Sequence, residues 1–364
     1  MDKNHYCIIM AGGIGSRFWP VSRNLKPKQF LDILGTGKTF IQQTYDRFLK
    51  VVPKENILVV TSAQYEALVK EQLPDMLHDN ILLEPYRKNT APCIAYAVYK
   101  LATLNPNATM VVAPSDHLIL DEEMFIETIK SALEYTIEND SLITLGIKPT
   151  RIETAYGYIQ YNKKQSIDIV GNTAYKVKTF TEKPDAELAK VFIESGEFLW
   201  NSGIFIWNLR TIKGELERYQ SEIASLFAKG EGIYHTDKEE DFIESVYEGC
   251  PSISIDYGIM EKTDKAILYP ASFGWSDLGT WDSLYVQLDR DECNNVVKAE
   301  RIMLNEVKES LIISDEPGKL IVAANLDGYM IVNTEDVLMI CPRSEAIFKN
   351  IITDLPVKEL SDFQ

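Results

Sequence analysis

A cluster of glycines and cationic residues near the N-terminus could bind phosphate. Its members are Ala11, Gly12, Gly13, Gly15, Ser16, Arg17 and Lys28. Glycines let a backbone turn sharply and approach a ligand closely, and successive amide groups can form a cradle for an anion. Arginine and lysine add positive charge that pairs with phosphate oxygens. The cluster therefore predicts a loop that holds the phosphate tail of a nucleoside triphosphate.

Two familiar phosphate-binding motifs do not fit this region. The dinucleotide fingerprint requires a small residue where Phe18 stands, and the P-loop pattern that ends at Lys38 and Thr39 lacks its first glycine. Asp32 stands at that position instead. Lys38 is expected in a turn before a helix that begins near Thr39. An ordinary strand-to-helix turn is the alternative interpretation of the loop at 11–17, but it does not explain so many glycines beside clustered arginine and lysine.

Two aspartates that are far apart in the sequence could hold a divalent cation. Asp116 follows the apolar run 109–114, and Asp277 lies in a turn rich in glycine and tryptophan. A magnesium ion on a nucleotide takes hard oxygen ligands, usually one or two carboxylates together with phosphate oxygens and water. Taken singly, an aspartate in such a position is more typical of a turn or a helix N-cap. The residue types alone therefore leave both interpretations open.

Further polar residues stand at the ends of other apolar runs. Glu84 could accept hydrogen bonds from the ring and amino N–H groups of guanine, a pattern that adenine and uracil do not offer. A surface acid at a strand end is an equally good interpretation. Glu182 and Lys183 place an acid beside a base, although a lone Glu-Lys-Pro segment is usually a solvated strand end. Asp256 is expected to cap the helix that runs to Lys262, with a place in the site as the alternative.

Alternating strand and helix patterns would position these residues. Buried strands are predicted at 6–10, 57–61, 81–85, 109–114 and 141–146, and helices at 63–73, 90–104 and 122–138. This alternation predicts an α/β fold with a Rossmann-like, mostly parallel sheet flanked by helices on both faces. Ligands of such folds bind beyond the carboxyl ends of the strands. The glycine loop and the segments 84–92 and 114–117 all follow strands, so we expect them to meet at one edge of the sheet.

The sequence pattern changes at about residues 287–293. The residues that follow form short apolar runs separated by glycine and asparagine, such as 311–314 and 329–333. We therefore divide the chain into a large domain at 1–288, which contains the candidate site residues, and a small β-rich domain at 289–364. The second domain has no convincing internal repeat.

Composition limits the classes of protein and of partner. The chain has 364 residues, of which 45% are hydrophobic and 25% charged, as is typical of a soluble globular protein. A net charge of −17 argues against nucleic acid as a partner, whereas the basic N-terminal loop suits a small anionic ligand. Five widely spaced cysteines indicate reduced thiols and no zinc site. The apolar runs are too short for a membrane span or a secretory signal, so we expect a cytoplasmic protein with no membrane partner.

The run from Ala11 to Leu31 resembles the signature of the sugar-nucleotide pyrophosphorylases. The matching residues are Gly15-Ser16-Arg17-Phe18-Trp19-Pro20 and Pro27-Lys28-Gln29-Phe30-Leu31. This signature is most similar to that of the guanylyl branch, and later motifs extend the resemblance over nearly the whole chain. The resemblance implies a nucleotidyltransferase fold of the GT-A type, a C-terminal domain formed as a short left-handed β-helix, and a homodimer that associates through its C-terminal region.

The resemblance also implies roles for individual residues. Nucleotide-binding residues would be Ala11, Gly12, Gly13, Gly15, Ser16, Arg17, Lys28, Glu84, Asn89, Thr90, Pro114 and Asp116. Sugar-phosphate-binding residues would be Gly157, Glu182, Lys183 and Asn201. The catalytic set would be Arg17, Lys28, Asp116, Lys183 and Asp277, with Mg²⁺ held by Asp116 and Asp277. Two departures from the family are visible, because Arg87-Lys88 stand where Gly-Arg is general and Ala155 stands where glycine is common.

The reaction implied by the resemblance joins mannose 1-phosphate and GTP to give GDP-mannose and pyrophosphate. The sugar phosphate would attack the α-phosphorus in line, and it needs no activating base because the second pKa of a phosphate monoester is about 6. One alternative is a relative that combines glucose 1-phosphate with ATP, UTP or dTTP. The other is a non-catalytic sensor of a sugar nucleotide, which the presence of both acids and both lysines argues against.

Overall fold

The computed structural model describes residues 2–14 and 16–363. Contacts divide the chain into two compact units. The large unit contains Met1–Gly13 and Ile41–Asp277, and the small unit contains Ile14–Phe40 and Leu278–Gln364. The small unit thus combines an N-terminal segment with the C-terminal residues, whereas the sequence-based division after residue 288 is continuous. That division remains a prediction about domains.

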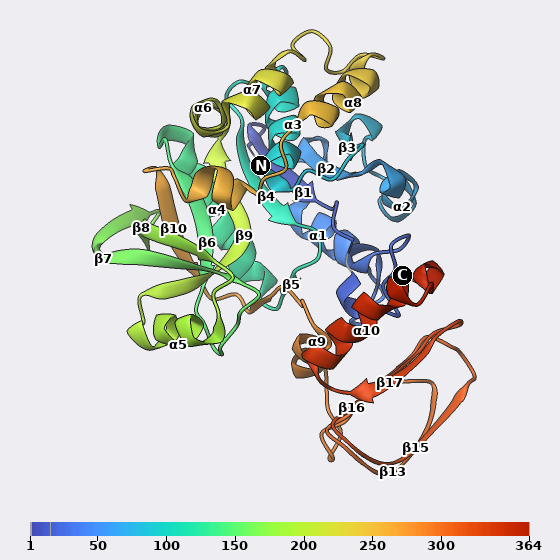
Figure 1. Cartoon of the computed structure of the whole chain (residues 1–364). Helices are drawn as coiled ribbons and strands as arrows, with labels where there is room; N and C mark the ends of the chain where they lie inside the picture. The colour runs from blue at the N-terminus through green and yellow to red at the C-terminus, as the bar shows by residue number, and fades with distance from the viewer. Residues whose placement is uncertain (1, 15, 364) are drawn as a thin grey trace. The chain divides into compact units, whose positions relative to one another are not determined.

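A nine-stranded sheet forms the centre of the large unit, with the strand order β3-β2-β1-β4-β9-β6-β10-β8-β7 (Figure 1). The strands are β1 (His5–Met10), β2 (Ile57–Ser62), β3 (Ile81–Glu84), β4 (Thr109–Pro114), β6 (Leu142–Ile147), β7 (Gly157–Ile169), β8 (Asn172–Glu182), β9 (Phe198–Asn208) and β10 (Ala266–Ala271). Within this sheet β8 and β9 pair antiparallel with their neighbours, and the other strands share one direction. The predicted mostly parallel sheet is confirmed, and the five predicted strands correspond to β1, β2, β3, β4 and β6.

Helices cover both faces of this sheet. The helices of the large unit are α1 (Phe40–Phe48), α2 (Glu66–Gln72), α3 (Thr90–Ala102), α4 (Glu122–Glu138), α5 (Ala186–Ser195), α6 (Leu209–Tyr219), α7 (Ser221–Ala228) and α8 (Glu239–Gly249). Met110 and Val112 of β4 join one buried cluster with residues of α3, α6, α7 and α8. Successive strand residues face opposite ways, so Val111 faces the other side, and α4 packs against β4 there with Ile129 and Leu133, which lie outside that cluster. The three predicted helices correspond to α2, α3 and α4.

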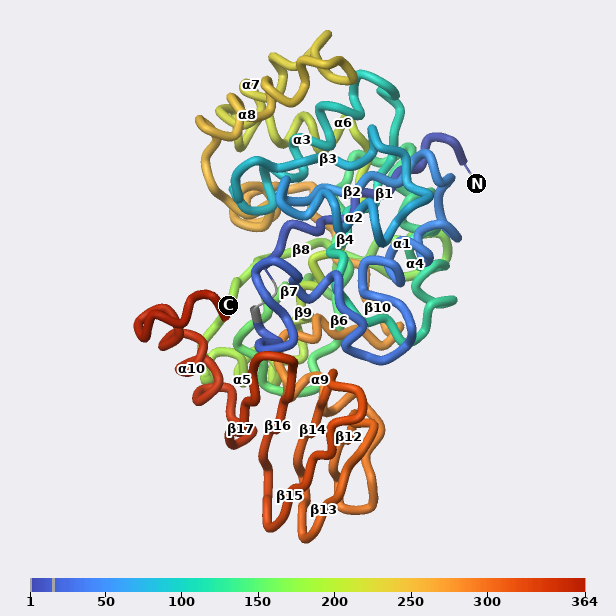
Figure 2. The backbone as a smooth tube through the Cα atoms, turned by 90° about the vertical axis from the view of Figure 1, so that its right-hand side faces the viewer, coloured from blue at the N-terminus to red at the C-terminus, as the bar shows by residue number. Residues whose placement is uncertain are grey.

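Short, mostly parallel strands stack in two sheets in the C-terminal part of the small unit, where only the last pairing, between residues 329–333 and 338–342, is antiparallel among the described strands (Figure 2). The strands are β12 (Val296–Lys298), β13 (Arg301–Lys308), β14 (Leu311–Ser314), β15 (Leu320–Asp327), β16 (Tyr329–Asn333) and β17 (Leu338–Pro342). One sheet has the order β12-β14-β16-β17, and the other pairs β13 with β15. The chain therefore alternates between the sheets from β12 to β16, which is typical of a short parallel β-helix. The predicted β-rich C-terminal region is confirmed, and its left-handed coiling remains a prediction.

The segment 14–40 associates with the C-terminal residues through aromatic and polar contacts. Trp281 begins α9 (Trp281–Gln287), packs its ring edge-on against Phe18 at 5.0 Å, and donates from Nε1 to the Trp19 carbonyl oxygen at 3.2 Å. Arg23 forms an ion pair with Asp336 at 2.7 Å. These long-range contacts explain why the segment belongs to the small unit. The last long helix, α10 (Glu345–Val357), was not expected from the sequence.

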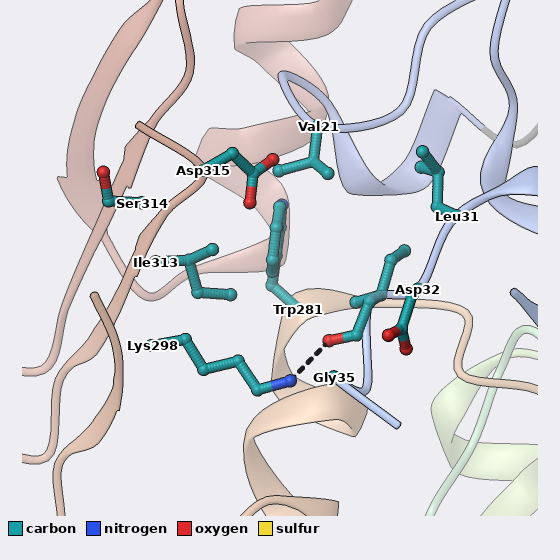
Figure 3. A pocket seen from close by; sticks show the side chains of 10 residues that line it. Val21, Leu31, Asp32, Gly35, Trp281, Lys298, Ile313, Ser314 and Asp315 are labelled. Carbon is teal, nitrogen blue, oxygen red and sulfur yellow. Dashed lines mark hydrogen bonds between the residues drawn. The ribbon is translucent and has the colours of Figure 1, made fainter. Parts of the chain in front are cut away.

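A pocket of 350 Å³ lies within the small unit (Figure 3). Lys298 lines it and donates a hydrogen bond to the Ile33 carbonyl oxygen at 2.8 Å. Asp32 also lines it and accepts hydrogen bonds from the backbone N–H groups of Thr36 at 2.9 Å and Gly37 at 2.7 Å. The Asp32 carboxylate thus shapes the turn at 35–39 that the sequence predicts before α1.

Among the described residues, no helix has both the length and the apolar character that crossing a bilayer requires.

Candidate active site

The loop after β1 is held at its first residue. The backbone N–H of Ala11 donates to the Val60 carbonyl oxygen at 2.8 Å, and Thr61 Oγ1 donates to the Ala11 carbonyl oxygen at 3.0 Å. A Cβ atom on Gly12 would lie 3.0 Å from Glu84 Oε2, so this glycine permits close packing of the loop on the carboxylate. Gly13 is exposed, and a Cβ there would meet no atom within 4 Å. Gly13 is therefore accessible to a ligand, next to the residues that fix the start of the loop.

The other residues that were predicted to bind phosphate follow in the segment 15–28. Gly15 is outside the described residues, and Ser16 begins a short 3-10 turn, Ser16–Phe18, in the small unit. Arg17 in this turn is exposed. Lys28 is only 3% exposed, and its ammonium lies 5.1 Å from the centroid of the Phe40 ring. This cation–π contact stabilises the lysine among apolar side chains. Phosphate binding by these residues remains a prediction.

Glu84 is buried at the carboxyl end of β3. The Tyr247 hydroxyl on α8 donates to its Oε1 atom at 2.9 Å, and its Oε2 atom lies beneath Gly12. Burial raises the pKa of Glu84 to about 7, although the hydrogen bond from Tyr247 and the charge of Arg87 act in the opposite direction. Guanine recognition by this carboxylate remains a prediction. Tyr247 had no sequence signal, because it lies in an ordinary amphipathic helix 163 residues away.

Asn89 and Thr90 form the start of α3. Asn89 adopts a φ of +69° and its Oδ1 atom accepts from the backbone N–H of Thr90 at 2.8 Å. Thr90 Oγ1 accepts from the backbone N–H of Ile255 at 2.8 Å. Both side chains therefore help to build the helix start and tie it to the segment before residue 256. Their contact with the base or ribose remains a prediction.

A short strand pair brings together the segments that carry the two predicted metal ligands. β5 (Leu118–Ile119) pairs antiparallel with β11 (Trp275–Ser276), and Ser276 lies opposite Leu118. Asp277 directly follows β11 and Asp116 lies two residues before β5, so the two aspartates stand at the same end of this pair. Both are half-buried. Pro114, two residues earlier, ends β4 and lies 3.6 Å from the position of a Cβ on Gly203.

The donor set of this strand pair suits magnesium. Asp116 and Asp277 supply hard carboxylate oxygens from two adjacent segments, as expected for an ion that also binds substrate phosphate and water. Within the described ranges, no group of three or more His, Cys, Asp or Glu side chains is arranged to enclose a metal by itself.

Tyr156 lies against one of these carboxylates. Its hydroxyl donates to Asp277 Oδ1 at 2.5 Å and accepts from Arg151 Nη2 at 3.4 Å. Burial, followed by the charge of Asp277, raises the pKa of Tyr156, so the phenol stays protonated and acts as a donor. Tyr156 was missed, although it stands directly before Gly157, which the resemblance assigns to sugar-phosphate binding.

Three of the predicted sugar-phosphate residues converge. Gly157 of β7 pairs with Glu182 of β8. A Cβ on Gly157 would overlap Glu182 Oε1 and lie 3.3 Å from Asn201 Cβ, so glycine is required for this approach. Lys183 follows Glu182 with a φ of +47°, and its backbone N–H donates to the Tyr156 carbonyl oxygen at 3.2 Å. Its side chain is exposed.

Asp256 belongs to this cluster, and its predicted capping role is wrong. Asn201 Nδ2 donates to Asp256 Oδ1 at 2.8 Å, while Asn201 Oδ1 accepts from the backbone N–H of Gly203 at 3.1 Å. Asp256 begins a π-helix, Asp256–Met260, and Ser254 Oγ accepts from the Tyr257 N–H at 3.2 Å instead. Burial, followed by the charge of Glu182, raises the pKa of Asp256 to about 7. The Asp256 carboxylate thus bonds to the asparagine, and the hydroxyl of Ser254 accepts an N–H of the helix start instead.

Comparisons with known proteins agree with this architecture. A family model described as nucleotidyl transferase matches residues 6–292. The mannose-1-phosphate guanylyltransferase of Salmonella typhimurium is 38% identical over 92% of this chain and 68% of its own length. A protein of the same name from Escherichia coli K12 is 36% identical over 93% of this chain and 70% of its own length. A crystal structure from Thermus thermophilus, described as mannose-1-phosphate geranyltransferase, has a TM-score of 0.85 and 29% identity, covering 97% of this chain and 99% of that one. The chain belongs to the nucleotidyl transferase family.

Proposed function

We propose that this chain is a mannose-1-phosphate guanylyltransferase, which transfers GMP from GTP to mannose 1-phosphate and releases pyrophosphate. The observation that carries the proposal is the β5–β11 pair, which places Asp116 and Asp277 on adjacent segments of a nucleotidyl transferase fold. The names of relatives at 36–38% identity over more than nine-tenths of this chain support the same substrates.

The reaction requires positioning more than activation. A phosphate oxygen of mannose 1-phosphate forms a bond to the α-phosphorus of GTP, and the bond from that phosphorus to the bridging oxygen of pyrophosphate breaks. The nucleophile is already anionic because the second pKa of a phosphate monoester is about 6. The difficulty is to hold two polyanions in line and to stabilise the leaving group, which orientation and electrostatics supply.

Asp116 and Asp277 are the proposed protein ligands of Mg²⁺. Bound between these carboxylates and the nucleotide, the ion would neutralise charge on the phosphate oxygens. The half-buried positions of both aspartates support this role, because a partly desolvated carboxylate attracts a cation more strongly than an exposed one.

The sugar phosphate is proposed to bind at the Gly157 cluster, which consists of Gly157, Glu182 and Asn201. Glu182 would accept hydrogen bonds from sugar hydroxyls, and Asn201 would contact another hydroxyl. Lys183 would pair with the phosphate, since its side chain is exposed beside that cluster. The close approach of Gly157 to Glu182 supports this assignment, because the missing side chain lets the Glu182 carboxylate lie against the strand beside Asn201.

The nucleotide assignments rest on the sequence motifs. Ala11 to Ser16 would hold the triphosphate through backbone amides, with Arg17 and Lys28 as cationic partners of pyrophosphate. Glu84, with Asn89 and Thr90, would contact guanine or ribose. The buried Glu84 carboxylate lies against Gly12, and this supports its assignment, because a nucleotide held by the glycine loop would lie close to it.

A pyrophosphate-release assay with Mg²⁺ tests this function. It crosses GTP, ATP, UTP and dTTP with mannose 1-phosphate and glucose 1-phosphate. We expect the fastest release with GTP and mannose 1-phosphate. Faster release with glucose 1-phosphate and another nucleotide would move the chain to a different branch of the family. Nucleotide binding without release in any combination would identify a non-catalytic sensor.

A homodimer and a cytoplasmic location complete the proposal. Met303 of β13 lies opposite Val322 of β15, and these apolar side chains are 56% and 55% exposed, which supports association of two copies through the small unit. All five cysteines are free, as a reducing compartment would keep them. Light scattering after gel filtration tests the dimer, and Met303→Lys with Val322→Lys should convert it to a monomer.

A further inference from the structure

Tyr156 connects two groups of residues to which the proposed function gives separate tasks. Its hydroxyl donates to Asp277 Oδ1 at 2.5 Å. Its carbonyl oxygen accepts from the backbone N–H of Lys183 at 3.2 Å. The next residue, Gly157, packs against Glu182 and Asn201. One residue thus contacts a proposed metal ligand through its side chain and the proposed sugar-phosphate residues through its backbone.

The Tyr156 ring has little freedom to move independently of that backbone. It is 6% exposed and packs edge-on against Trp200 at 5.1 Å and against Trp275 at 5.2 Å. Trp275 itself belongs to β11 and donates from Nε1 to His117 Nδ1 at 3.0 Å. A close-packed aromatic side chain transmits backbone displacement to its tip, because neighbouring rings exclude other rotamers. A shift at Gly157 would therefore move the phenol beside Asp277.

The hydrogen bond also selects one oxygen of the carboxylate. Tyr156 occupies Oδ1 of Asp277, and Arg151 Nη2 approaches the phenol at 3.4 Å while pairing with Glu153 at 3.0 Å. Groups that hydrogen-bond to a ligating carboxylate orient it and typically change metal affinity or activity about 10–100-fold when they are removed. Tyr156 is such a group for the proposed ligand Asp277, and the side chains of Arg151 and Glu153 hold the phenol in turn.

We propose that Tyr156 is a positioning residue that couples occupation of the sugar-phosphate site to the orientation of the Asp277 carboxylate, so that sugar binding and metal binding strengthen one another. This inference rests on the proposed function, because it uses the sites assigned there. The coupling is reciprocal, since two ligands that favour the same arrangement each raise the affinity of the other by one factor.

Binding of GDP-mannose measured by calorimetry with and without Mg²⁺ tests the coupling without turnover. The coupling factor is the ratio of the metal-free dissociation constant to that in Mg²⁺. We expect this factor to exceed one in the unaltered protein. In Tyr156→Phe the factor should be at least about 10-fold smaller, or equal to one where the unaltered protein has a factor below about 10. Metal-free affinity should change less than about 2-fold, because phenylalanine keeps the ring contacts.

Tyr269→Phe is the matched control. Tyr269 is a 4% exposed tyrosine of the same sheet whose hydroxyl contacts Ser131 Oγ at 3.0 Å. Its removal should leave the coupling factor unchanged. If Tyr156→Phe proves unstable, Arg151→Gln provides the second test, because it removes the cation that contacts the phenol while the Tyr156 ring stays in place, and it should also lower the coupling factor.

Two results would overturn the inference. One is an unchanged coupling factor in Tyr156→Phe, whether or not metal-free affinity is lost, and the other is a factor of one in the unaltered protein. Both leave the proposed function intact if pyrophosphate release continues. Absence of both GDP-mannose binding and pyrophosphate release in the unaltered protein would instead remove the proposed function, and the inference with it.

Discussion

Replacing Glu84 with glutamine should make the protein more stable at high pH. The carboxylate is 7% exposed and its pKa is raised from 4.5 to about 7 by burial. A shift of this size corresponds to about 3 kcal/mol, because one pKa unit is about 1.4 kcal/mol. Glutamine is uncharged at every pH and keeps an oxygen that can accept the hydrogen bond from Tyr247, so the substitution removes the cost of burying a charge.

The sign of the pH dependence follows from the direction of this shift. An acid whose pKa is higher in the folded state binds its proton more tightly there, so its contribution favours folding at low pH. That contribution is lost as the pH rises from about 4.5 to about 7. The stability of Glu84→Gln relative to the unaltered protein should therefore increase across this window, by up to about 3 kcal/mol, and stay constant above it.

Urea unfolding followed by circular dichroism at pH 5, 6, 7 and 8 measures this difference. Comparison of two variants cancels the titration of all other groups. Glu71→Gln is the control, since Glu71 is exposed and its replacement should change stability by less than about 0.5 kcal/mol at every pH. A stability difference for Glu84→Gln that is the same at pH 5 and pH 8 would refute the account of a buried carboxyl group.

Three further predictions concern turnover, substrate affinity and stability. Asp116→Asn and Asp277→Asn should each lower kcat at least about 100-fold without lowering the thermal midpoint, and near-normal turnover in both would contradict the metal assignment. Lys183→Ala should raise the KM for mannose 1-phosphate far more than that for GTP, and an unchanged sugar-phosphate KM would remove its role. Gly157→Ala should cost about 1–3 kcal/mol of stability and weaken GDP-mannose binding, because its Cβ would displace Glu182; calorimetry and thermal unfolding measure both effects.

Local patterns in the sequence predict the frame of the large unit. Strands at 57–61 and 109–114 are recognisable because continuous apolar runs suit a sheet buried on both faces, and they correspond to β2 and β4. The glycines at 12 and 13 indicate a loop for close approach, and the structure explains the first of them through Glu84. Such signals depend only on residues that are close in sequence, so they can be recognised without knowledge of the fold.

Long-range pairing is not encoded in those local patterns. The capping interpretation of Asp256 was wrong because Ser254 and Asp256 are equally good capping types, and only the approach of Asn201 from β9 separates them. Likewise, nothing near residues 14–40 indicates that Phe18 and Trp281 would meet. The β5–β11 pair is only two residues long in each strand, too short for a periodic pattern.

From the sequence one can recognise the family resemblance, the alternation of strands and helices, and the residue types that suit phosphate and Mg²⁺. The contacts of those residues depend on the fold, which brings Asp277 to Tyr156 across 121 positions and Glu84 to Tyr247 across 163. Glycine, charge and apolar periodicity act over a few residues, whereas a hydrogen bond between buried groups forms only after the whole sheet has brought them together.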